Sequence, residues 1–185
     1  MYKRQGYKIT AVSGSDSRGT EEPEARNASG YGSSATAILS QALSQAAIRE
    51  AVLGGRALVK TLGVDESPHV ELEAFDASGQ SVSYGGQLVL DASATATLRL
   101  AISGAQGQRL MLYRNGQLQQ SQLILSDEEI VQLPIQRDPA SEGPLGSWWR
   151  FDLVADGLIF NGRPVIGPAT TAIGNPVFLS ATALE

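Results

Sequence analysis

The sequence predicts a mainly β protein in which most of the chain forms an antiparallel β-sandwich. From about residue 64 onward, short runs of alternating apolar and polar residues follow one another, and no helical period persists. Turn signals separate these runs, and Asn115-Gly116 and Asp156-Gly157 are pairs that tolerate the positive φ of tight hairpins. With 185 residues, of which 42% are hydrophobic, the chain can bury an ordinary core. A β-barrel fits the same pattern, but a sandwich is more typical of this length.

The pattern also predicts the position of each strand in this second region, residues 64–185. In chain order the strands are expected at residues 70–75, 87–90, 95–102, 109–113, 117–125, 130–135, 148–154 and 176–180. Alternation in the run 148–154 places Trp149, Phe151 and Leu153 on one face, and Trp148, Arg150 and Asp152 on the other. An exposed Trp beside an Arg is one way to build a carbohydrate platform. The other interpretation is that Trp148 covers a sheet edge or packs against a neighbouring domain.

The first region, residues 1–63, combines strands, loops and a helix. Ser44 is expected to cap a helix whose apolar residues recur at helical spacing and which Gly54-Gly55 ends. This region is predicted to contain strands at residues 7–12, 35–39 and 56–62, a small polar loop at 13–19 and a long surface loop at 20–34. A small polar loop directly after a strand is typical of a functional site.

Composition and charge exclude several classes of function. The net charge is −5 and the fourteen basic residues are scattered, so a nucleic-acid partner is not expected. No apolar run is long enough to span a bilayer. The chain has no cysteine, which removes disulfides, thiolate catalysis and zinc–thiolate sites, but cellular location stays open.

Few side chains could serve as metal ligands or as a general base. His69 is the single histidine, and its place at the start of an alternating run favours an ordinary strand-edge residue over a ligand. The loop acids Glu21, Glu22 and Glu24 lack the spacing of a calcium loop and are expected to be solvated. The run 126–129, Ser-Asp-Glu-Glu, is expected to form a turn between strands.

The order of several motifs resembles one family. Gly14-Ser15-Asp16-Ser17 follows a strand, and a Gly/Ser-rich loop leads to the helix with its Ala-x-x-x-Gly-Arg ending at Arg56. The chain then closes on Asn175-Pro176 before a last strand. Together these pieces resemble the C-terminal part of a PHP-type (polymerase and histidinol phosphatase) metal-dependent hydrolase, in the branch whose barrel carries a β-sandwich tail. The resemblance spans residues 7–180 and implies a strand–loop–helix remnant of a β/α barrel followed by an immunoglobulin-like β-sandwich.

The resemblance also implies a metal site that this chain holds only in part. Asp16 matches the aspartate of the family's Gly-Ser-Asp-x-His motif and would be a metal ligand. Arg18 stands in place of that motif's histidine, and a guanidinium has no lone pair to give to a metal. Either the parent enzyme binds fewer metals, or its site has lost metal chemistry and Arg18 binds a substrate anion. A third interpretation pairs Arg18 with a carboxylate of its own loop.

These expectations lead to two hypotheses about function. In the first, the chain is a fragment of a phosphoesterase-like hydrolase. The intact parent would use a divalent metal (Zn, Mn or Fe), whereas this chain would bind none and be inactive without its N-terminal barrel half. Residues 1–5 would then be foreign, because a back-translation of them resembles a transposon end used in sequencing libraries; a genuine basic N-terminus is the alternative. In the second hypothesis, the chain is a non-catalytic β-sandwich module that binds glycans or proteins.

Overall fold

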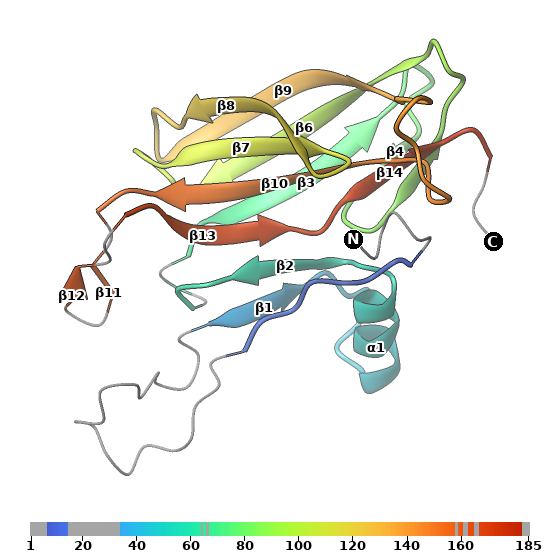
Figure 1. Ribbon diagram of the computed structural model, residues 1–185. Coiled ribbons are helices and arrows are strands. Elements are labelled where there is room, and N and C mark those ends of the chain that lie inside the picture. The colour runs from blue at the N-terminus through green and yellow to red at the C-terminus, as the bar shows by residue number, and fades with distance from the viewer. Residues whose placement is uncertain are drawn as a thin grey trace.

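The computed structural model describes residues 7–14, 34–63, 65, 67–157, 159–160, 163–164 and 167–182. Within these residues the fold is mainly β, with antiparallel sheets and a single α-helix, which confirms the predicted class (Figure 1). The helix is α1 (Gln45–Leu53). The strands are β1 (Ala35–Ile38), β2 (Ala57–Lys60), β3 (His69–Phe75), β4 (Ser81–Val82), β5 (Gln87–Val89), β6 (Thr95–Ser103), β7 (Arg109–Arg114), β8 (Gln117–Leu123), β9 (Glu128–Gln136), β10 (Ser147–Ala155), β11 (Ile159–Phe160), β12 (Arg163–Pro164), β13 (Ala169–Gly174) and β14 (Val177–Ser180).

The larger sheet has eight strands and is organised around β10. On one side β10 pairs with β7, which in turn pairs with β8 at the edge. On its other side β10 pairs first with β14 and then with β13, so β13 and β14 together form one interrupted neighbour. Beyond that neighbour, β13 pairs with β2, whereas β14 pairs in parallel with β5. The interruption at Asn175-Pro176 therefore marks the point where the outer partner changes.

The smaller sheet has four strands in the order β4-β3-β6-β9, all antiparallel. Burial alternates along β6 and β9, as expected for strands with one face in a core and the other toward water. Buried side chains of both sheets join in one hydrophobic cluster, to which β3 and β6 contribute Leu72, Leu98 and Leu100 and β7 and β10 contribute Leu112 and Leu153. The core therefore lies between the two sheets.

Phe151 stands at the centre of this core. Its side chain is fully buried and lies against the ring of Tyr84, with 6.4 Å between the ring centroids. Gly174 allows this packing, because a Cβ at that position would lie 2.4 Å from Phe151 Cε1. The Tyr84 hydroxyl donates a hydrogen bond to the Val70 carbonyl over 2.7 Å, and burial raises the pKa of Tyr84 well above its ordinary range. Trp149 and Leu153 are buried beside Phe151, which confirms the predicted face of this strand.

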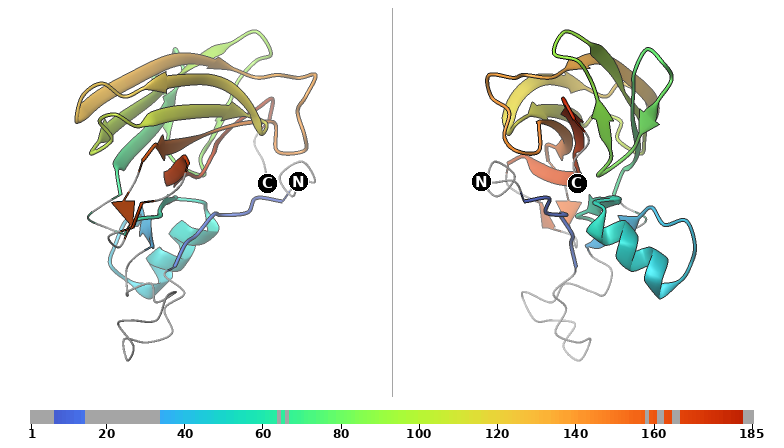
Figure 2. Two further views of the ribbon diagram at one scale, coloured as in Figure 1. Left: turned by 60° about the vertical axis from the view of Figure 1, so that its left-hand side comes forward. Right: turned by 90° about the vertical axis from the view of Figure 1, so that its right-hand side faces the viewer.

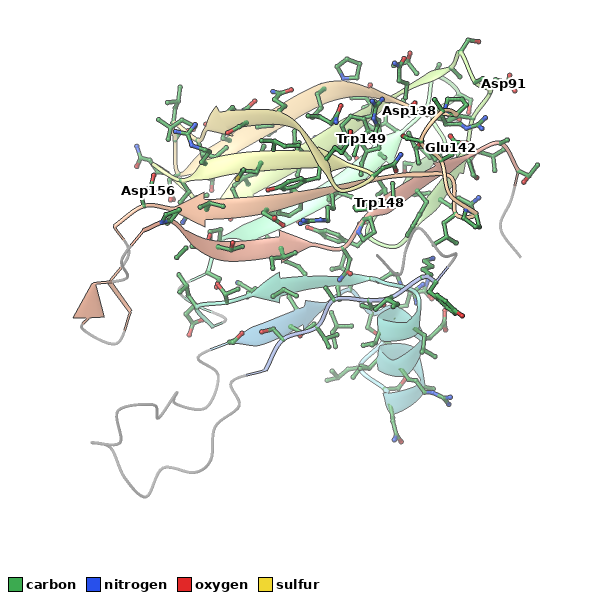
Figure 3. The ribbon with its side chains drawn as sticks, in the orientation of Figure 1. Asp91, Asp138, Glu142, Trp148, Trp149 and Asp156 are labelled. Atoms are coloured by element: carbon green, nitrogen blue, oxygen red, sulfur yellow. The ribbon has the colours of Figure 1, made fainter. Side chains whose placement is uncertain are left out.

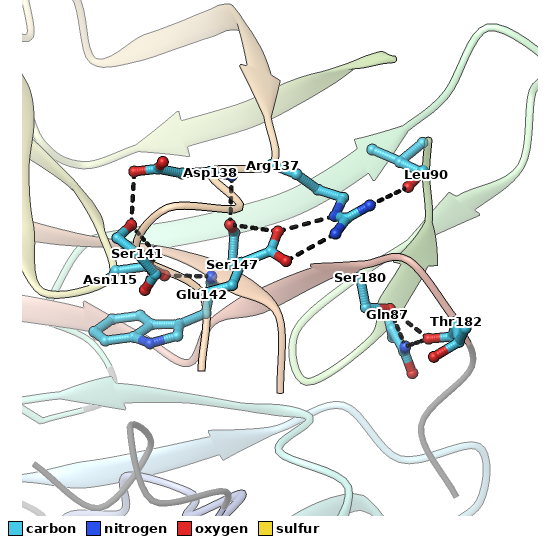
Figure 4. Close-up of polar contacts among 11 residues, drawn as sticks. Gln87, Leu90, Asn115, Arg137, Asp138, Ser141, Glu142, Ser147, Ser180 and Thr182 are labelled. Atoms are coloured by element: carbon cyan, nitrogen blue, oxygen red, sulfur yellow. Dashed lines mark hydrogen bonds and ion pairs between the residues drawn. The ribbon is translucent and has the colours of Figure 1, made fainter. Parts of the chain in front are cut away.

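Polar side chains fix the loop that leads into β10. The Arg137 guanidinium donates two hydrogen bonds of 2.8 Å to the carboxylate of Glu142 and one of 3.0 Å to the Leu90 carbonyl (Figure 4). Ser147, which is fully buried, donates to Glu142 and accepts from the backbone N–H of Asp138. The hydrogen bonds from Arg137 are the main reason that the pKa of Glu142 is held below its usual value.

The helix α1 lies at one end of the molecule, away from β6, β8 and β9 (Figures 1 and 2). Ser44 is its N-cap and accepts a hydrogen bond from the backbone N–H of Ala47, as predicted. The end of the helix packs closely against Gly85. A Cβ on Gly85 would lie 1.8 Å from the Gly54 carbonyl oxygen, so this contact requires a glycine there. The end of α1 therefore touches the turn before β5 directly through the backbone.

The sequence pattern placed most strands correctly and missed a few. The strand β13 was not predicted, and the expected turn at residues 126–129 ends early because β9 begins at Glu128. The expected strand at residues 7–12 is extended backbone that pairs with no strand among the described residues. The first predicted region contributes β1 and β2 to the same sheet as β13 and β10, and the boundary at residues 63/64 stays a prediction.

Candidate functional site: the segment before Asp16

Residues 7–14 form an extended segment that lies beside α1 and leads toward the predicted metal ligand. We call it the anchored segment, because side chains from the sheet and the helix hold it in place. In Figure 1 it runs as a coil past β1 and α1. It ends at Gly14, two positions before Asp16 in the sequence. Its geometry therefore bears on any site that Asp16 would build.

Asn175 bonds the middle of the anchored segment. Its Oδ1 accepts a hydrogen bond from the Ala11 N–H over 2.8 Å, and its Nδ2 donates to the Ala11 carbonyl over 3.0 Å. Nδ2 also donates to the carbonyl of Ala57 in β2 over 2.8 Å. Asn175 is only 1% exposed, so these bonds satisfy a buried amide.

A second anchor lies near the end of the segment. Thr36 on β1 accepts a hydrogen bond from the Ser13 N–H over 2.7 Å and donates to the Ser13 carbonyl over 2.9 Å. The Ser13 hydroxyl also contacts that of Ser34, which donates to the Lys60 carbonyl. Ser13 is therefore tied to β1 at its backbone and, through Ser34, to β2.

The side chains of the anchored segment also contact α1 and β14. The Thr10 hydroxyl donates a hydrogen bond to the carbonyl of Val52 in the helix over 2.6 Å. The Lys8 ammonium lies 5.4 Å from the centre of the Phe178 ring. Burial, and next the charge of Arg56, lower the pKa of Lys8.

On the other edge of the anchored segment, the described residues supply no such partners for the backbone. In extended chain, the backbone groups of alternate residues point to opposite edges, so Ala11 and Ser13 face the sheet while Thr10 and Val12 face away. Within the described residues, no hydrogen bond involves the backbone of Thr10 or Val12. Tyr7, Ile9 and Val12 are 61%, 47% and 59% exposed. Among the described residues, the segment thus has one edge with an unpaired backbone, and it also exposes apolar side chains.

The predicted site residues fall mostly beyond what the structure describes. Asp16, Arg18 and the acids Glu21, Glu22 and Glu24 lie outside the described residues, so their predicted roles stay predictions. His69 is the exposed first residue of β3 and borders two shallow grooves of about 520 and 400 Å³, which Glu71 also lines. No group of three or more His, Cys, Asp or Glu within the described part could hold a metal ion. That part does not fit a metal centre by itself, and we derive no catalytic step from it.

A different polar surface lies on the outward face of β7 and β10. Trp148, Arg150 and Asp152 are partly exposed there, on the face opposite the buried Trp149. Figure 3 labels the two tryptophans on β10. The Arg150 guanidinium lies 4.4 Å from the centre of the Tyr113 ring and pairs with the Asp152 carboxylate. Burial raises the pKa of Asp152 despite the opposing effect of Arg150. This face carries two aromatic rings beside a paired cation and anion.

From the sequence, Asn175-Pro176 was identified only as part of a family motif, and Asn175 was given no anchoring role. The anchoring role of Asn175 needs two partners, Ala11 and Ala57, that lie 164 and 118 residues away along the chain. No local pattern encodes contacts at such separations. The only signal was the position of a polar residue between two apolar runs.

Comparisons of the chain with protein-family models, with curated proteins and with solved structures return no match. Within the described residues, no helix is both long enough and apolar enough to cross a membrane.

Proposed function

We propose that this chain is the C-terminal part of a PHP-type metal-dependent hydrolase. In this proposal, residues 1–63 are a strand–loop–helix remnant of the barrel and residues 64–185 are an immunoglobulin-like β-sandwich. The observation that carries the proposal is the anchored segment, whose inner edge is held by Asn175 and Thr36 while its outer edge has no backbone partner among the described residues. A strand of this kind needs a neighbour on its outer edge, and a preceding barrel strand would supply one.

In the proposed parent enzyme, Asp16 is a metal ligand and the remaining ligands come from the upstream barrel half. A divalent metal (Zn, Mn or Fe), when bound there, would supply the Lewis acid for phosphoester hydrolysis. Arg18 cannot take the ligand role of the family's histidine, because its guanidinium stays protonated. We propose that Arg18 binds the substrate anion, or that the parent enzyme binds fewer metals than its relatives.

The isolated chain provides the first test of this proposal. We expect it to hydrolyse no phosphoester when Mn²⁺ or Zn²⁺ is added, because one carboxylate cannot hold a metal cluster. Metal content after equilibrium dialysis and turnover of an aryl phosphate would be measured on the wild type and on Asp16→Ala. Turnover that disappears in Asp16→Ala, or two or more tightly bound ions per chain, would contradict the proposal.

The outward face of β7 and β10 favours a second candidate, a non-catalytic module that binds glycans or proteins. Trp148 and Tyr113 supply aromatic rings, and Arg150 with Asp152 supplies hydrogen-bonding groups beside them. Titration of neutral oligosaccharides into ¹⁵N-labelled chain would test the glycan form of this candidate. Saturable shifts around Trp148 that Trp148→Ala removes, and that Leu118→Ala keeps, would support it. An absence of shifts would exclude neutral glycans as the ligand.

A further inference from the structure

The side-chain amide of Asn175 occupies the place that a neighbouring strand would take. Its Oδ1 and Nδ2 bond both backbone groups of Ala11, which reproduces the paired donor and acceptor of an antiparallel ladder. An amide has two N–H donors, and the second is used on the Ala57 carbonyl. Turning the amide over would set its NH₂ group against the Ala11 N–H, so only one orientation satisfies all three contacts.

Asn175 can act in this way because the sheet is interrupted beside it. It lies between β13 and β14, where the outer partner changes from β2 to β5. Gly174 brings the chain close to Phe151, and the Pro176 carbonyl accepts a hydrogen bond from the Gly85 N–H over 2.8 Å. The backbone on both sides of Asn175 is therefore fixed by its contacts, and this holds the buried side chain in place.

We infer that Asn175 is a positioning residue that sets where the segment before Asp16 lies relative to the sheet. The significance of Asp16 in this statement rests on the proposed function. Asn175 fixes Ala11 against β2, and Thr36 fixes Ser13 against β1 two residues later. Through these two points, Asn175 between β13 and β14 and Thr36 on β1 fix the backbone at Ala11 and Ser13, shortly before Asp16 in the sequence. A residue of the second predicted region thus holds a segment of the first.

Spin labels provide a direct test, because the chain contains no cysteine. One label would be placed at Gly14→Cys, where an added Cβ meets nothing within 4 Å. The other would be placed at Gln119→Cys, on the exposed face of β8. Double electron–electron resonance then gives the distribution of distances between the anchored segment and the sheet.

We expect a narrow distribution in the otherwise unchanged chain and a broad one in Asn175→Ala. Amide exchange at Ala11 should also be about tenfold faster or more in Asn175→Ala, because its N–H loses its partner. The matched control is Thr171→Val, which removes the hydroxyl that a fully buried side chain in the same sheet uses to bond Gln108 and the Leu153 carbonyl. The control should lower Tm but keep the narrow distribution and the slow exchange. If Asn175 contributed only to overall stability, the two variants would behave alike.

A second variant keeps the test decisive if Asn175→Ala does not fold. Ala11→Pro removes the donor to Oδ1 and fixes φ at residue 11, but it leaves the core sequence intact, and it should broaden the distribution as well. An unchanged distribution in a folded Asn175→Ala, or in Ala11→Pro, would overturn the inference whatever the metal chemistry. The distribution could broaden while Asp16 proves dispensable for hydrolysis in the proposed parent enzyme. That result would support the positioning role of Asn175 and refute the proposed function.

Discussion

Two edges of this molecule differ in the side chains that they expose to water. Among the described strands, β8 pairs only with β7, and apart from Leu118 and Leu123 its exposed side chains are glutamine and serine. The anchored segment at residues 7–14 also has one edge that no described residue pairs with, yet it exposes Tyr7, Ile9 and Val12. Polar residues on an edge strand discourage further pairing, whereas apolar ones invite it. The edge of β8 is therefore suited to solvent, and the edge of the anchored segment is suited to a partner.

The two edges also differ in what holds them. The backbone of β8 bonds to β7 along its length, and β7 contributes Leu110 and Leu112 to the core. The anchored segment has no strand partner among the described residues and depends on hydrogen bonds from Asn175, Thr36 and Thr10. We therefore expect substitutions in the core to affect stability far more than substitutions in the segment.

The largest effect is expected at Phe151. This residue lies in the core to which β7, the partner of β8, contributes Leu110 and Leu112. Phe151→Ala removes a fully buried ring that packs on Tyr84, so the free energy of unfolding should fall by about 3–5 kcal/mol. Urea denaturation followed by tryptophan fluorescence would measure this change. A loss below about 1 kcal/mol would mean that the core does not close around this residue.

The next effect is expected at the backbone contact between α1 and the β-sheets. Gly85→Ala adds a Cβ that would lie 1.8 Å from the Gly54 carbonyl oxygen, at a residue with a φ of +73°. Gly79→Ala is the matched control, because its φ is +87° but nothing lies within 4 Å of the added Cβ. Both variants should lose about 1 kcal/mol through strain, and Gly85→Ala should lose at least about 2 kcal/mol more through the clash. Equal losses in thermal denaturation would show that the contact is absent.

Acid should weaken the loop held by Arg137. The pKa of Glu142 is lowered in the folded chain, so its contribution is fully present above the unfolded value of 4.5 and is lost as the pH falls through the lower folded value. The stability gap between wild type and Glu142→Gln should therefore narrow as the pH is lowered from about 5 into the acid range. Asp152→Asn gives the opposite sign, because burial raises the pKa of Asp152 and its ionisation destabilises the fold as the pH rises. Urea midpoints across this range would measure both, and a constant gap for Glu142→Gln would contradict the assignment.

The smallest effect on stability is expected in the anchored segment. Ile9→Ser should lower the free energy of unfolding by about 1 kcal/mol or less, because Ile9 is only about half buried. The same change should reduce self-association of the isolated chain, measured by sedimentation velocity, because it removes exposed apolar surface beside the unpaired backbone. Leu118→Ser on β8 is the control and should leave association unchanged. A reduction from Leu118→Ser and none from Ile9→Ser would reverse the comparison of the two edges.

The sequence predicted those features of the fold that depend on neighbouring residues. Ser44 and Gly54 delimit α1 as expected, because a cap and a stop act within one turn. Asn115 and Gly116 take the positive φ values that the β7–β8 hairpin requires. The alternation in β10 also placed Phe151 in the core. Each of these signals is local in the chain.

Features that depend on distant residues were not predictable in this way. The parallel pairing of β14 with β5 and the close approach of Gly85 to Gly54 bring together residues that no periodicity relates. The strand β13 carries Thr170 and Thr171 with little alternation, so its pairing with β10 and β2 determines it more than its own sequence does. For the candidate site, the pattern indicated a functional loop after residue 12, but not that Asn175 and Thr36 would fix its entrance.

The most direct test of the proposed function is the activity of the proposed parent enzyme, in which this chain follows the barrel half that the proposal places before it. We expect that barrel half to contain a strand with a His-x-His motif, and the parent enzyme to hydrolyse an aryl phosphate in the presence of Mn²⁺ or Zn²⁺. Asp16→Ala should lower that activity at least about a hundredfold, because it removes a metal ligand. A parent protein that lacks such histidines, or that keeps full metal-dependent activity in Asp16→Ala, would contradict the proposal.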